Sequence, residues 1–286
     1  MERSANITTG DYRALLESAV PTLSDFSIGF ALPSAKDGSI DACLGGSGTL
    51  VTIDAVQGIL TANHVIERLR KNRFVGLILP TRFEPKIHHL SLEMQHCSHV
   101  SFAFQGQEAD WPDFGLLIPP PSVLSALKAR KSFYNLSNRQ ERMLGKPPAV
   151  DHGFWVLSGL AAEWTNDLSP ESGYSKVKQF RGLHGAGVAP KECHRGTFDY
   201  FIYEVLYNDL YEGPDDYGGF SGGGLWQLLV KPNGNKLQIA DWLLSGVAWY
   251  ESKKKNDAGQ ITREITCHGR RSLYQALIDK VRAGSS

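Results

Sequence analysis

The chain contains 286 residues, and its 30 basic and 30 acidic side chains balance to a formal net charge of zero. A chain of this length can bury the core of one large β domain or of two medium domains. The balanced charge gives no electrostatic basis for binding nucleic acid or an anionic membrane surface. Because no run of about 18 apolar residues occurs, the sequence predicts no membrane-spanning helix.

The N-terminus and the cysteines indicate the cellular compartment. The first stretch, MERSANITTGDYRALLE, has an early glutamate and no apolar segment, which is unlike a secretory signal. The four cysteines form no CxxC pair, which disfavours a cysteine-rich metal site: Cys43, Cys97, Cys193 and Cys267. We therefore expect reduced thiols and a cytoplasmic location.

The predicted elements are mostly short strands. Residues 11–19 show helical spacing, with Thr8 or Thr9 as a cap and Pro21 just beyond, so they predict a short N-terminal helix. Short apolar runs rich in Val, Ile and aromatics then alternate with Gly, Pro, Asn and Asp clusters, which is typical of an all-β sandwich or barrel. The last stretch predicts a C-terminal helix with an apolar stripe: Leu273, Ala276, Leu277 and Val281.

A polar stretch divides the strand-rich sequence into two parts of comparable size. Residues 128–148 are weakly patterned, and we interpret them as a linker. The expected organisation is a helical segment at 1–27, a first β unit at 28–127 and a second β unit at 149–286 that ends in the C-terminal helix.

Three separate stretches carry side chains suited to chemistry. In GILTANHVI, residues 58–66, a strand-like run delivers His64 at its tip. Asp113 opens the apolar run FGLLI and therefore stands at a strand edge. In GFSGGGLW, residues 219–226, four glycines surround Ser221. Glycine costs roughly 0.5–1 kcal/mol relative to alanine inside a regular element, so this cluster indicates a backbone that other residues cannot adopt.

Together these stretches supply what acyl transfer needs. A serine hydroxyl is a weak nucleophile until a base takes its proton, and histidine suits this role near neutral pH. A carboxylate behind the histidine fixes its tautomer and stabilises the imidazolium. A tight turn before Ser221 would direct the N–H groups of Gly219 and Ser221 into one oxyanion-binding cavity. We therefore predict a hydrolase with Ser221 as nucleophile, His64 as base and Asp113 as its partner.

Each signal alone has a plainer interpretation. A strand-end histidine usually packs, an acid at a strand start usually belongs to a turn, and a glycine cluster can be a flexible loop. Asp110 is an alternative to Asp113, which we prefer because the apolar run follows it directly. The coincidence of the three stretches, in the order His, Asp, Ser, favours the catalytic interpretation.

GFSGG also fits the G-x-S-x-G elbow of α/β-hydrolases. That fold requires a helix directly behind the serine and a histidine later in the chain. The run Gly222-Gly223-Gly224 opposes a helix, and His268, the one histidine after Ser221, directly precedes the C-terminal helix. The residue order fits the chymotrypsin arrangement instead.

Several motifs resemble those of trypsin/chymotrypsin-like serine proteases. TANHV resembles the family's TA-x-H, DFGLL its Asp-x-Ala-Leu-Leu, and GFSGGGLW its Gly-Asp-Ser-Gly-Gly-Pro-Leu. GSGTLVT (46–52) and LSGVAWY (244–250) resemble two further strands of that family, and the resemblance covers roughly residues 28–283. It implies two six-stranded antiparallel β-barrels with the triad in the cleft between them, a protein or peptide substrate, and no cofactor.

Some positions depart from the family pattern. Phe220 stands where the family often has an aspartate that pairs with a freed N-terminus, so activation by N-terminal cleavage is not expected. No cysteine stands beside His64 or Ser221 to form the usual disulfides, and Gly224 replaces a proline. The sequence is in these respects more similar to divergent bacterial trypsin-like peptidases.

The resemblance also indicates where specificity would be set. Asp215 lies six positions before the serine, at the base of the family's primary pocket, where an acid would favour Arg or Lys before the scissile bond. Alternatively, Asp215 belongs to an exposed turn. The strand at 244–250 would pair with the substrate backbone, so Trp249, Tyr250 and Glu251 are candidate substrate-binding residues. Glu251 is a second candidate cation binder, and Trp249 is most simply a core aromatic.

The sequence thus predicts a serine endopeptidase whose specificity is narrow or depends on activation by a regulatory protein partner. Two alternatives remain open: a catalytically silent protease fold used as a binding module, and an acyl ester hydrolase on the same triad. No metal site is expected. The histidines near Cys97 match no closed zinc set and are interpreted as a surface loop: His88, His89, His96 and His99.

Overall fold

The structure is a computed structural model, and it describes residues 9–36, 39–80, 88–103, 112–168, 177–179, 182–187, 189–204, 214, 216–234, 236–255 and 261–284. Its dominant elements are β-strands, arranged in two large sheets whose pairing is almost entirely antiparallel. The mostly-β composition that the sequence predicted is therefore confirmed. Within the described part of the chain, no helix has the length and apolar character needed to cross a membrane.

The first sheet contains the strands of the N-terminal half. In spatial order they are β5 (His88–Glu93), β4 (Phe74–Leu79), β1 (Ser27–Lys36), β2 (Ser39–Ile53), β3 (Val56–Thr61), β7 (Phe114–Ile118) and β6 (Ser98–Phe102). A short strand, β8 (Tyr134–Asn135), pairs parallel to β2. The connections include α2 (Asn63–Arg70), the 3-10 turn η1 (Met94–His96) and α3 (Pro121–Lys128).

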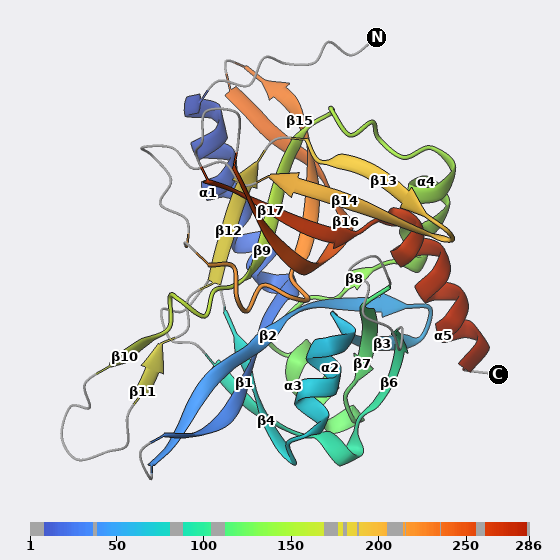
Figure 1. Cartoon of the computed structure of the whole chain (residues 1–286). Helices are drawn as coiled ribbons and strands as arrows, with labels where there is room; N and C mark the ends of the chain where they lie inside the picture. Colours follow the sequence, from blue (N-terminus) through green and yellow to red (C-terminus); the bar gives the residue numbers. More distant parts are fainter. Residues whose placement is uncertain are drawn as a thin grey trace.

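The second sheet contains the strands of the C-terminal half and lies above the first in Figure 1. In spatial order they are β12 (Gly182–Gly187), β9 (Phe154–Leu160), β15 (Gly224–Asn233), β16 (Lys236–Lys255), β17 (Ile261–His268), β14 (Phe198–Glu204) and β13 (Lys191–Arg195). A separate two-stranded ribbon is formed by β10 (Asn166–Leu168) and β11 (Val177–Gln179).

Both sheets follow the same strand order. If the hairpins β4–β5 and β13–β14 each count as one position, both sheets have six positions along the chain. In both, the first position pairs with the second and fourth, and the sixth pairs with the third and fifth. The first sheet lacks the link between its fourth and fifth positions, and the second sheet lacks the link between its second and third. The two halves therefore share one circuit, by which we mean the same ring of six strand positions with one pairing missing. Among the described residues, strand pairing closes neither half into a barrel.

One apolar core crosses the boundary between the sheets. It combines buried residues of the N-terminal helix, both sheets and the C-terminal helix, including Leu23, Val51, Phe114, Trp226, Leu243 and Leu273. Two further clusters lie inside the halves, one with Phe30, Leu50 and Leu77, and one with Trp155, Phe201 and Phe220. Because apolar burial is the main stabilising term in folding, the shared core makes the two sheets one packed body.

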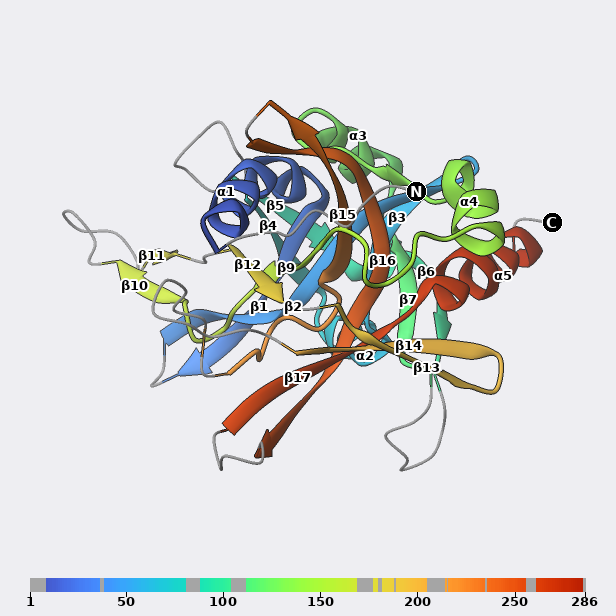
Figure 2. The same cartoon turned by 90° about the horizontal axis from the view of Figure 1, so that it is seen from above.

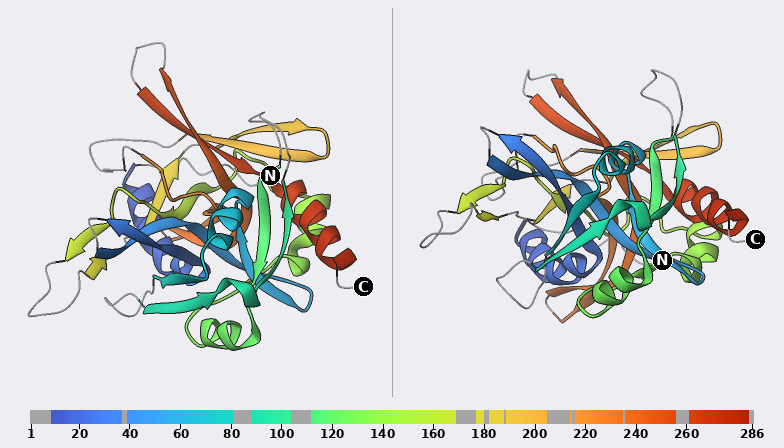
Figure 3. Two further views of the ribbon diagram at one scale, coloured as in Figure 1. Left: turned by 60° about the horizontal axis from the view of Figure 1, so that its bottom comes forward. Right: turned by 90° about the horizontal axis from the view of Figure 1, so that it is seen from below.

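Each terminal helix packs on the sheet that is formed by the opposite half of the chain. The N-terminal helix α1 (Thr9–Phe26) runs directly into β1 but contacts β9, β12 and β16 of the second sheet. The C-terminal helix α5 (Ile278–Gly284) follows the second sheet but contacts β6, where the Lys280 ammonium lies 4.2 Å from the centre of the Phe102 ring. The helices lie on opposite flanks of the molecule (Figure 2 and Figure 3).

The prediction that the N-terminal helix stops before Pro21 is wrong. α1 continues to Phe26 with Pro21 inside it, although proline removes a backbone donor and clashes with the preceding turn. The buried face explains why the helix continues, because Leu15, Ala19 and Leu23 lie four residues apart and are at most 2% exposed. Burial of this stripe offsets the local cost of the proline. The C-terminal helix is confirmed, although its first turn is a π-helical turn, η3 (Ser272–Leu277).

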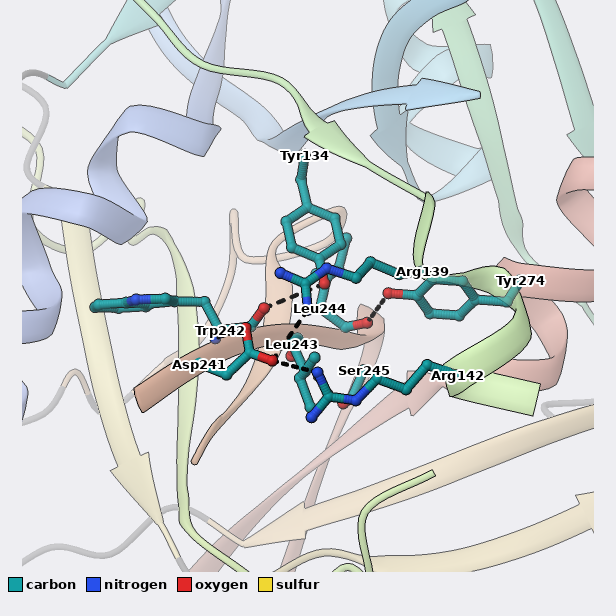
Figure 4. A network of polar contacts seen from close by, with 9 residues as sticks. All are labelled: Tyr134, Arg139, Arg142, Asp241, Trp242, Leu243, Leu244, Ser245 and Tyr274. Atoms are coloured by element: carbon teal, nitrogen blue, oxygen red, sulfur yellow. Dashed lines mark hydrogen bonds and ion pairs between the residues drawn. The ribbon is translucent and has the colours of Figure 1, made fainter. Parts of the chain in front are cut away.

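The polar stretch predicted as a linker is ordered and docked on the second sheet. It contains β8, the 3-10 turn η2 (Ser137–Arg139) and α4 (Gln140–Gly145). Arg139 donates to the carboxylate of Asp241 at 3.0 Å, and Arg142 binds the same carboxylate (Figure 4). The Tyr134 hydroxyl donates to the carbonyl oxygen of Trp242 at 3.2 Å.

The part of β16 that the linker contacts, at Asp241 and Trp242, lies between two β-bulges. The register with β15 skips Ala240 and Ser245, so residues 241–244 form a short regular segment between two irregular positions. Bulges interrupt the ladder and bend the strand locally. Within this segment the carbonyl oxygen of Leu244 accepts a hydrogen bond at 2.7 Å from Tyr274, which is fully buried and belongs to η3 (Figure 4). The bulged segment thus joins the linker to the C-terminal helix.

Replacing Tyr274 with Phe should destabilise the protein. The change keeps the ring but leaves the Leu244 carbonyl without its donor, so we expect the free energy of unfolding to fall by about 1–3 kcal/mol. Urea denaturation followed by tryptophan fluorescence measures this. The control is Tyr250→Phe, because Tyr250 is 47% exposed and its substitution should cost less than about 0.5 kcal/mol. Equal stabilities of the two variants would contradict the role given to the Tyr274 hydroxyl.

Candidate active site

His64 and Asp113 form a hydrogen-bonded pair at the ends of two adjacent strands. The His64 Nδ1 atom lies 2.5 Å from Asp113 Oδ2, and the His64 backbone N–H donates to Asp113 Oδ1 at 2.8 Å. β7 begins just after Asp113, and its register places Gly115 opposite Thr61 at the end of β3. This pairing explains why two residues that are 49 positions apart meet.

The Asp113 carboxylate has a second role as the cap of α2. His64 is the second residue of this helix, and the residue before the helix, Ala62, has no side-chain acceptor. Asp113 therefore satisfies one of the unpaired N–H donors of the first turn from a neighbouring strand. One carboxylate thus fixes both the backbone and the imidazole of His64.

Ser221 lies in a tight turn whose glycines are required by packing. Gly219 and Gly222 have φ angles of +97° and +92°, which L side chains rarely adopt. A Cβ atom on Gly222 would lie 2.0 Å from the carbonyl oxygen of Ser47 and 2.1 Å from Thr61 Oγ1. The turn therefore packs directly on Ser47, within β2, and on Thr61, which is the last residue of β3 and lies three residues before His64. The crowding of glycines around Ser221 is explained by this close approach.

Ser47, a residue that we did not select from the sequence, fastens the turn to the first sheet. Its N–H donates to the Ser221 carbonyl at 2.9 Å, and its hydroxyl donates to the Gly219 carbonyl at 2.7 Å. The same hydroxyl accepts a hydrogen bond at 2.8 Å from the N–H of Leu160 in β9. Ser47 is fully buried, and its carbonyl accepts from the Thr61 hydroxyl at 2.7 Å. The glycine in GSGTLVT drew attention to this strand, but nothing in the sequence showed that its serine bridges the sheets.

The amides predicted to form the oxyanion hole are available. In the turn, Phe220 N–H donates to Tyr217, Gly222 N–H to Ala248 and Gly223 N–H to Phe220. The N–H groups of Gly219 and Ser221 donate to none of the residues that the structure describes. Phe220 itself is 1% exposed, and its ring centre lies 4.9 Å from that of Tyr217. Apolar packing of Phe220 thus anchors the turn, and the oxyanion role remains a prediction.

The Ser221 hydroxyl points to a main-chain acceptor rather than to His64. Its Oγ atom donates to the Trp249 carbonyl at 3.4 Å, and no hydrogen bond joins it to His64 in the described part of the structure. The register between β16 and β17 skips Trp249, so its carbonyl belongs to a bulge. In ligand-free sites, the contact between nucleophile and base is often long and forms only with substrate.

His268 lies behind the pair and was not predicted as part of the site. Its Nε2 atom accepts a hydrogen bond at 3.0 Å from the backbone N–H of Asp113. The side chain is fully buried, and burial lowers its pKa to about 3, although the neighbouring Asp113 carboxylate opposes this shift. Sequence reasoning considered His268 only as the histidine of an α/β-hydrolase. It lies at the end of a strand, and no local signal linked it to Asp113.

The remaining candidate residues differ in how they are engaged. Asp215 and the alternative acid Asp110 lie outside the described residues. The Glu251 carboxylate accepts from Arg263 at 2.8 Å and from the Tyr217 N–H at 3.1 Å, so a substrate cation would compete with these partners. Trp249 and Tyr250 border a cavity of about 120 Å³, whose other lining residues are Cys193, Arg195, Tyr200, Ile202 and Thr266.

The four cysteines form no disulfide in the structure. His96 lies 3.4 Å from the Glu93 carboxylate, and among the residues that the structure describes no group of three or more His, Cys, Asp or Glu side chains could hold a metal ion.

Comparison of the sequence with protein families and curated proteins identifies no relative. No protein-family model matches the chain, and no curated protein is detectably similar in sequence. Among solved structures, a chain from work on the Sesbania mosaic virus VPg protein has 14% identity and a TM-score of 0.35, with 84% of this chain and 85% of that chain covered. The Bacillus subtilis inhibitor of motility MotI/DgrA has 9% identity and a TM-score of 0.18, with 90% and 96% covered. Similarities this low carry no argument about fold or function.

Replacing Ser47 with Ala should loosen the serine turn. The change removes the acceptor of the Leu160 N–H and the donor to the Gly219 carbonyl, so we expect a loss of about 1–3 kcal/mol in unfolding free energy. Hydrogen exchange at Gly222 and Gly223 should accelerate more than exchange in β4. A matched control is Ser125→Ala, whose hydroxyl is exposed and bonds within its own helix. Unchanged exchange in the turn would contradict the bridging role.

The buried His268 should make stability dependent on pH. Its pKa is about 3 in the folded protein and 6.5 as the ordinary value, so between these limits the unfolded chain binds more protons. The free energy of unfolding should therefore fall as the pH decreases from about 6.5 to about 3, by up to about 1.4 kcal/mol per pH unit. Urea denaturation at pH 4 to 7 measures this slope.

The comparison variant for this titration is His268→Gln, which should show a shallower slope over the same range. The control His96→Gln, at a histidine whose side chain is 58% exposed, should keep the slope of the unmodified protein. An identical slope in the His268→Gln variant would show that His268 does not titrate as we infer.

Proposed function

We propose that this protein is a serine endopeptidase in which Ser221 attacks the peptide carbonyl, His64 acts as base and then as acid, and Asp113 orients His64. The observation that carries the proposal is the His64–Asp113 pair at 2.5 Å, together with a serine turn that is fastened by Ser47 of β2 and packs on the end of β3, just before His64. A nucleophile, a base and an orienting carboxylate are the parts that acyl transfer requires.

The fold supports the proposal at the level of strand order. The two sheets repeat one six-position circuit, which is consistent with two related β units that each approach a barrel. We infer the double β-barrel of trypsin/chymotrypsin-like proteases from this repeat and from the motifs at His64, Asp113 and Ser221. The candidate residues come from both units. His64 and Asp113 belong to the first unit, next to the ends of β3 and β7, and Ser221 belongs to the second unit, just before β15.

The chemistry follows from the roles of the three side chains. His64 takes the proton of Ser221 as Oγ bonds to the substrate carbonyl carbon, and the imidazolium is stabilised by Asp113. The Gly219 and Ser221 N–H groups bind the resulting oxyanion, a contribution of about 3–4 kcal/mol for one such donor. His64 then protonates the leaving amine as the C–N bond breaks, and water hydrolyses the acyl-serine by the same steps.

Specificity is inferred from the sequence motifs. Asp215 would favour Arg or Lys before the scissile bond, and the cavity beside Trp249 and Tyr250 would receive another part of the peptide. Because the Ser221 hydroxyl bonds to Trp249 in the structure, we infer that substrate or partner binding promotes its transfer to His64. We therefore propose narrow or partner-activated cleavage.

The bond between Ser221 and Trp249 also supports a second function. A catalytically silent protease fold that serves as a binding module would keep the hydroxyl in this position with every partner. An acyl ester hydrolase would use the same residues as the endopeptidase on a different substrate.

A fluorophosphonate probe distinguishes these functions. Stoichiometric labelling at Ser221, located by mass spectrometry, is expected for the enzyme, because the probe reacts only with an activated serine. Ser221→Ala should abolish labelling, and His64→Ala should slow it by about 100-fold or more.

The control is Ser125→Ala, which removes an exposed hydroxyl that bonds within its own helix and should leave labelling unchanged. Failure of the folded, unmodified protein to be labelled, alone and with peptide substrates present, would support the silent module. Turnover of esters without peptides would support the ester hydrolase.

A further inference from the structure

His268 makes the contact between the second sheet and the acid of the proposed site. It is the last residue of β17, and its Nε2 atom accepts from the N–H of Asp113, just before β7 of the first sheet, at 3.0 Å. Asp113 and His64 both belong to the N-terminal half of the chain. His268 belongs to the second sheet, so the hydrogen bond joins the two halves.

The imidazole ring of His268 packs against three aromatic rings. Its ring centre lies 4.6 Å from that of Phe114, 5.0 Å from that of Tyr200 and 5.4 Å from that of Trp249, which is nearly parallel to it. The backbone of His268 pairs with Val247 in β16 and with Tyr200 in β14. These contacts restrict rotation of the ring, and the strand pairing holds the backbone of His268 in place.

The hydrogen bond defines the tautomer of His268. Because Nε2 accepts, the proton of the neutral ring must be on Nδ1, which is buried and has no partner among the described residues. Protonation of Nε2 would place an N–H against the N–H of Asp113. The Asp113 carboxylate acts on the ring electrostatically, the Tyr200 ring packs against it, and Cys267 is the preceding residue. Burial raises the pKa of both Tyr200 and Cys267. The ring therefore remains neutral under physiological conditions.

We propose that His268 is a positioning residue: its neutral Nε2 fixes the main chain of Asp113 and thereby directs the Asp113 carboxylate to His64. The proposal rests on the proposed function of that pair and adds a fourth side chain to it. His268 touches neither substrate nor the reacting atoms, so it acts only through Asp113.

The geometry gives this role a specific consequence. The Asp113 carboxylate must hold both the N–H and the Nδ1 of His64, and both distances depend on the position of one main-chain segment. A shift of that segment would change both distances, and the short bond of 2.5 Å to Nδ1 would lose the most energy for a given displacement. The effect of losing His268 should thus appear at His64.

Two substitutions separate the acceptor from the ring. His268→Phe keeps an aromatic ring but removes the acceptor, whereas His268→Gln places an amide oxygen close to where Nε2 lies. The first measurement is the proton NMR resonance of the short His64 Nδ1–H bond, which should lie at unusually low field. We expect this resonance to move upfield or disappear in the Phe variant and to persist in the Gln variant.

The second measurement is the rate of fluorophosphonate labelling at Ser221. We expect it to fall by about 10- to 100-fold in the Phe variant and by less than about threefold in the Gln variant. Thermal unfolding of both variants shows how far each is destabilised. A role in packing alone would lower stability without moving the His64 resonance.

The outcomes are distinct. An unchanged resonance and labelling rate in His268→Phe would overturn the positioning role, and so would a loss in His268→Gln as large as that in the Phe variant. If the Phe variant does not fold, nitrogen NMR of the unmodified protein decides, because a protonated Nε2 on His268 would overturn the proposal. If the unmodified protein is not labelled, the proposed function fails while the resonance still tests the role of His268.

Discussion

The arrangement of the candidate site depends on a few hydrogen bonds that cross from one sheet to the other at Ser47 of β2 and at Asp113, just before β7. Ser47 reaches Gly219, Ser221 and Leu160, all in the second half of the chain, while His268 reaches back to Asp113. The apolar core shared by the sheets supplies most of the stabilisation, but apolar contact is not directional. The polar contacts determine the relative position of the sheets, because hydrogen bonds require particular distances and angles.

The rest of the fold limits relative movement of the sheets around this junction. α1 packs on the second sheet, α5 packs on the first, and the connecting segment is fastened to β16 through Asp241. At the start of β1, the Ser27 hydroxyl lies 2.6 Å from that of Ser158 in β9, and it also bonds to the end of α1. Each connection joins segments that are distant in sequence, so a shift of one sheet would break contacts at several places at once.

The sequence predicted those features that are encoded locally. Short alternating runs indicated a mostly-β fold, and TANHV and DFGLL placed His64 and Asp113 at strand ends, where the register of β3 and β7 brings them together. It could not predict features that arise from tertiary contacts. The continuation of α1 through Pro21 depends on a buried face, and the docking of the linker depends on Asp241, about a hundred residues away in the chain. His268 looks like an ordinary strand-end histidine until Asp113 is placed against it.

The glycine cluster of GFSGGGLW has a consequence for the nucleophile. Gly222 lets the turn approach Ser47 and Thr61 closely. Ser221 therefore lies between these residues of the first sheet and the bulge at Trp249. Its hydroxyl then has a main-chain acceptor on one side and the first sheet on the other. A bond of 3.4 Å between neutral groups contributes at most about 1 kcal/mol, so a substrate that pairs with the Trp249 strand could release the hydroxyl at little cost. The same bulge that holds Ser221 in place would then make its reactivity depend on what binds beside it.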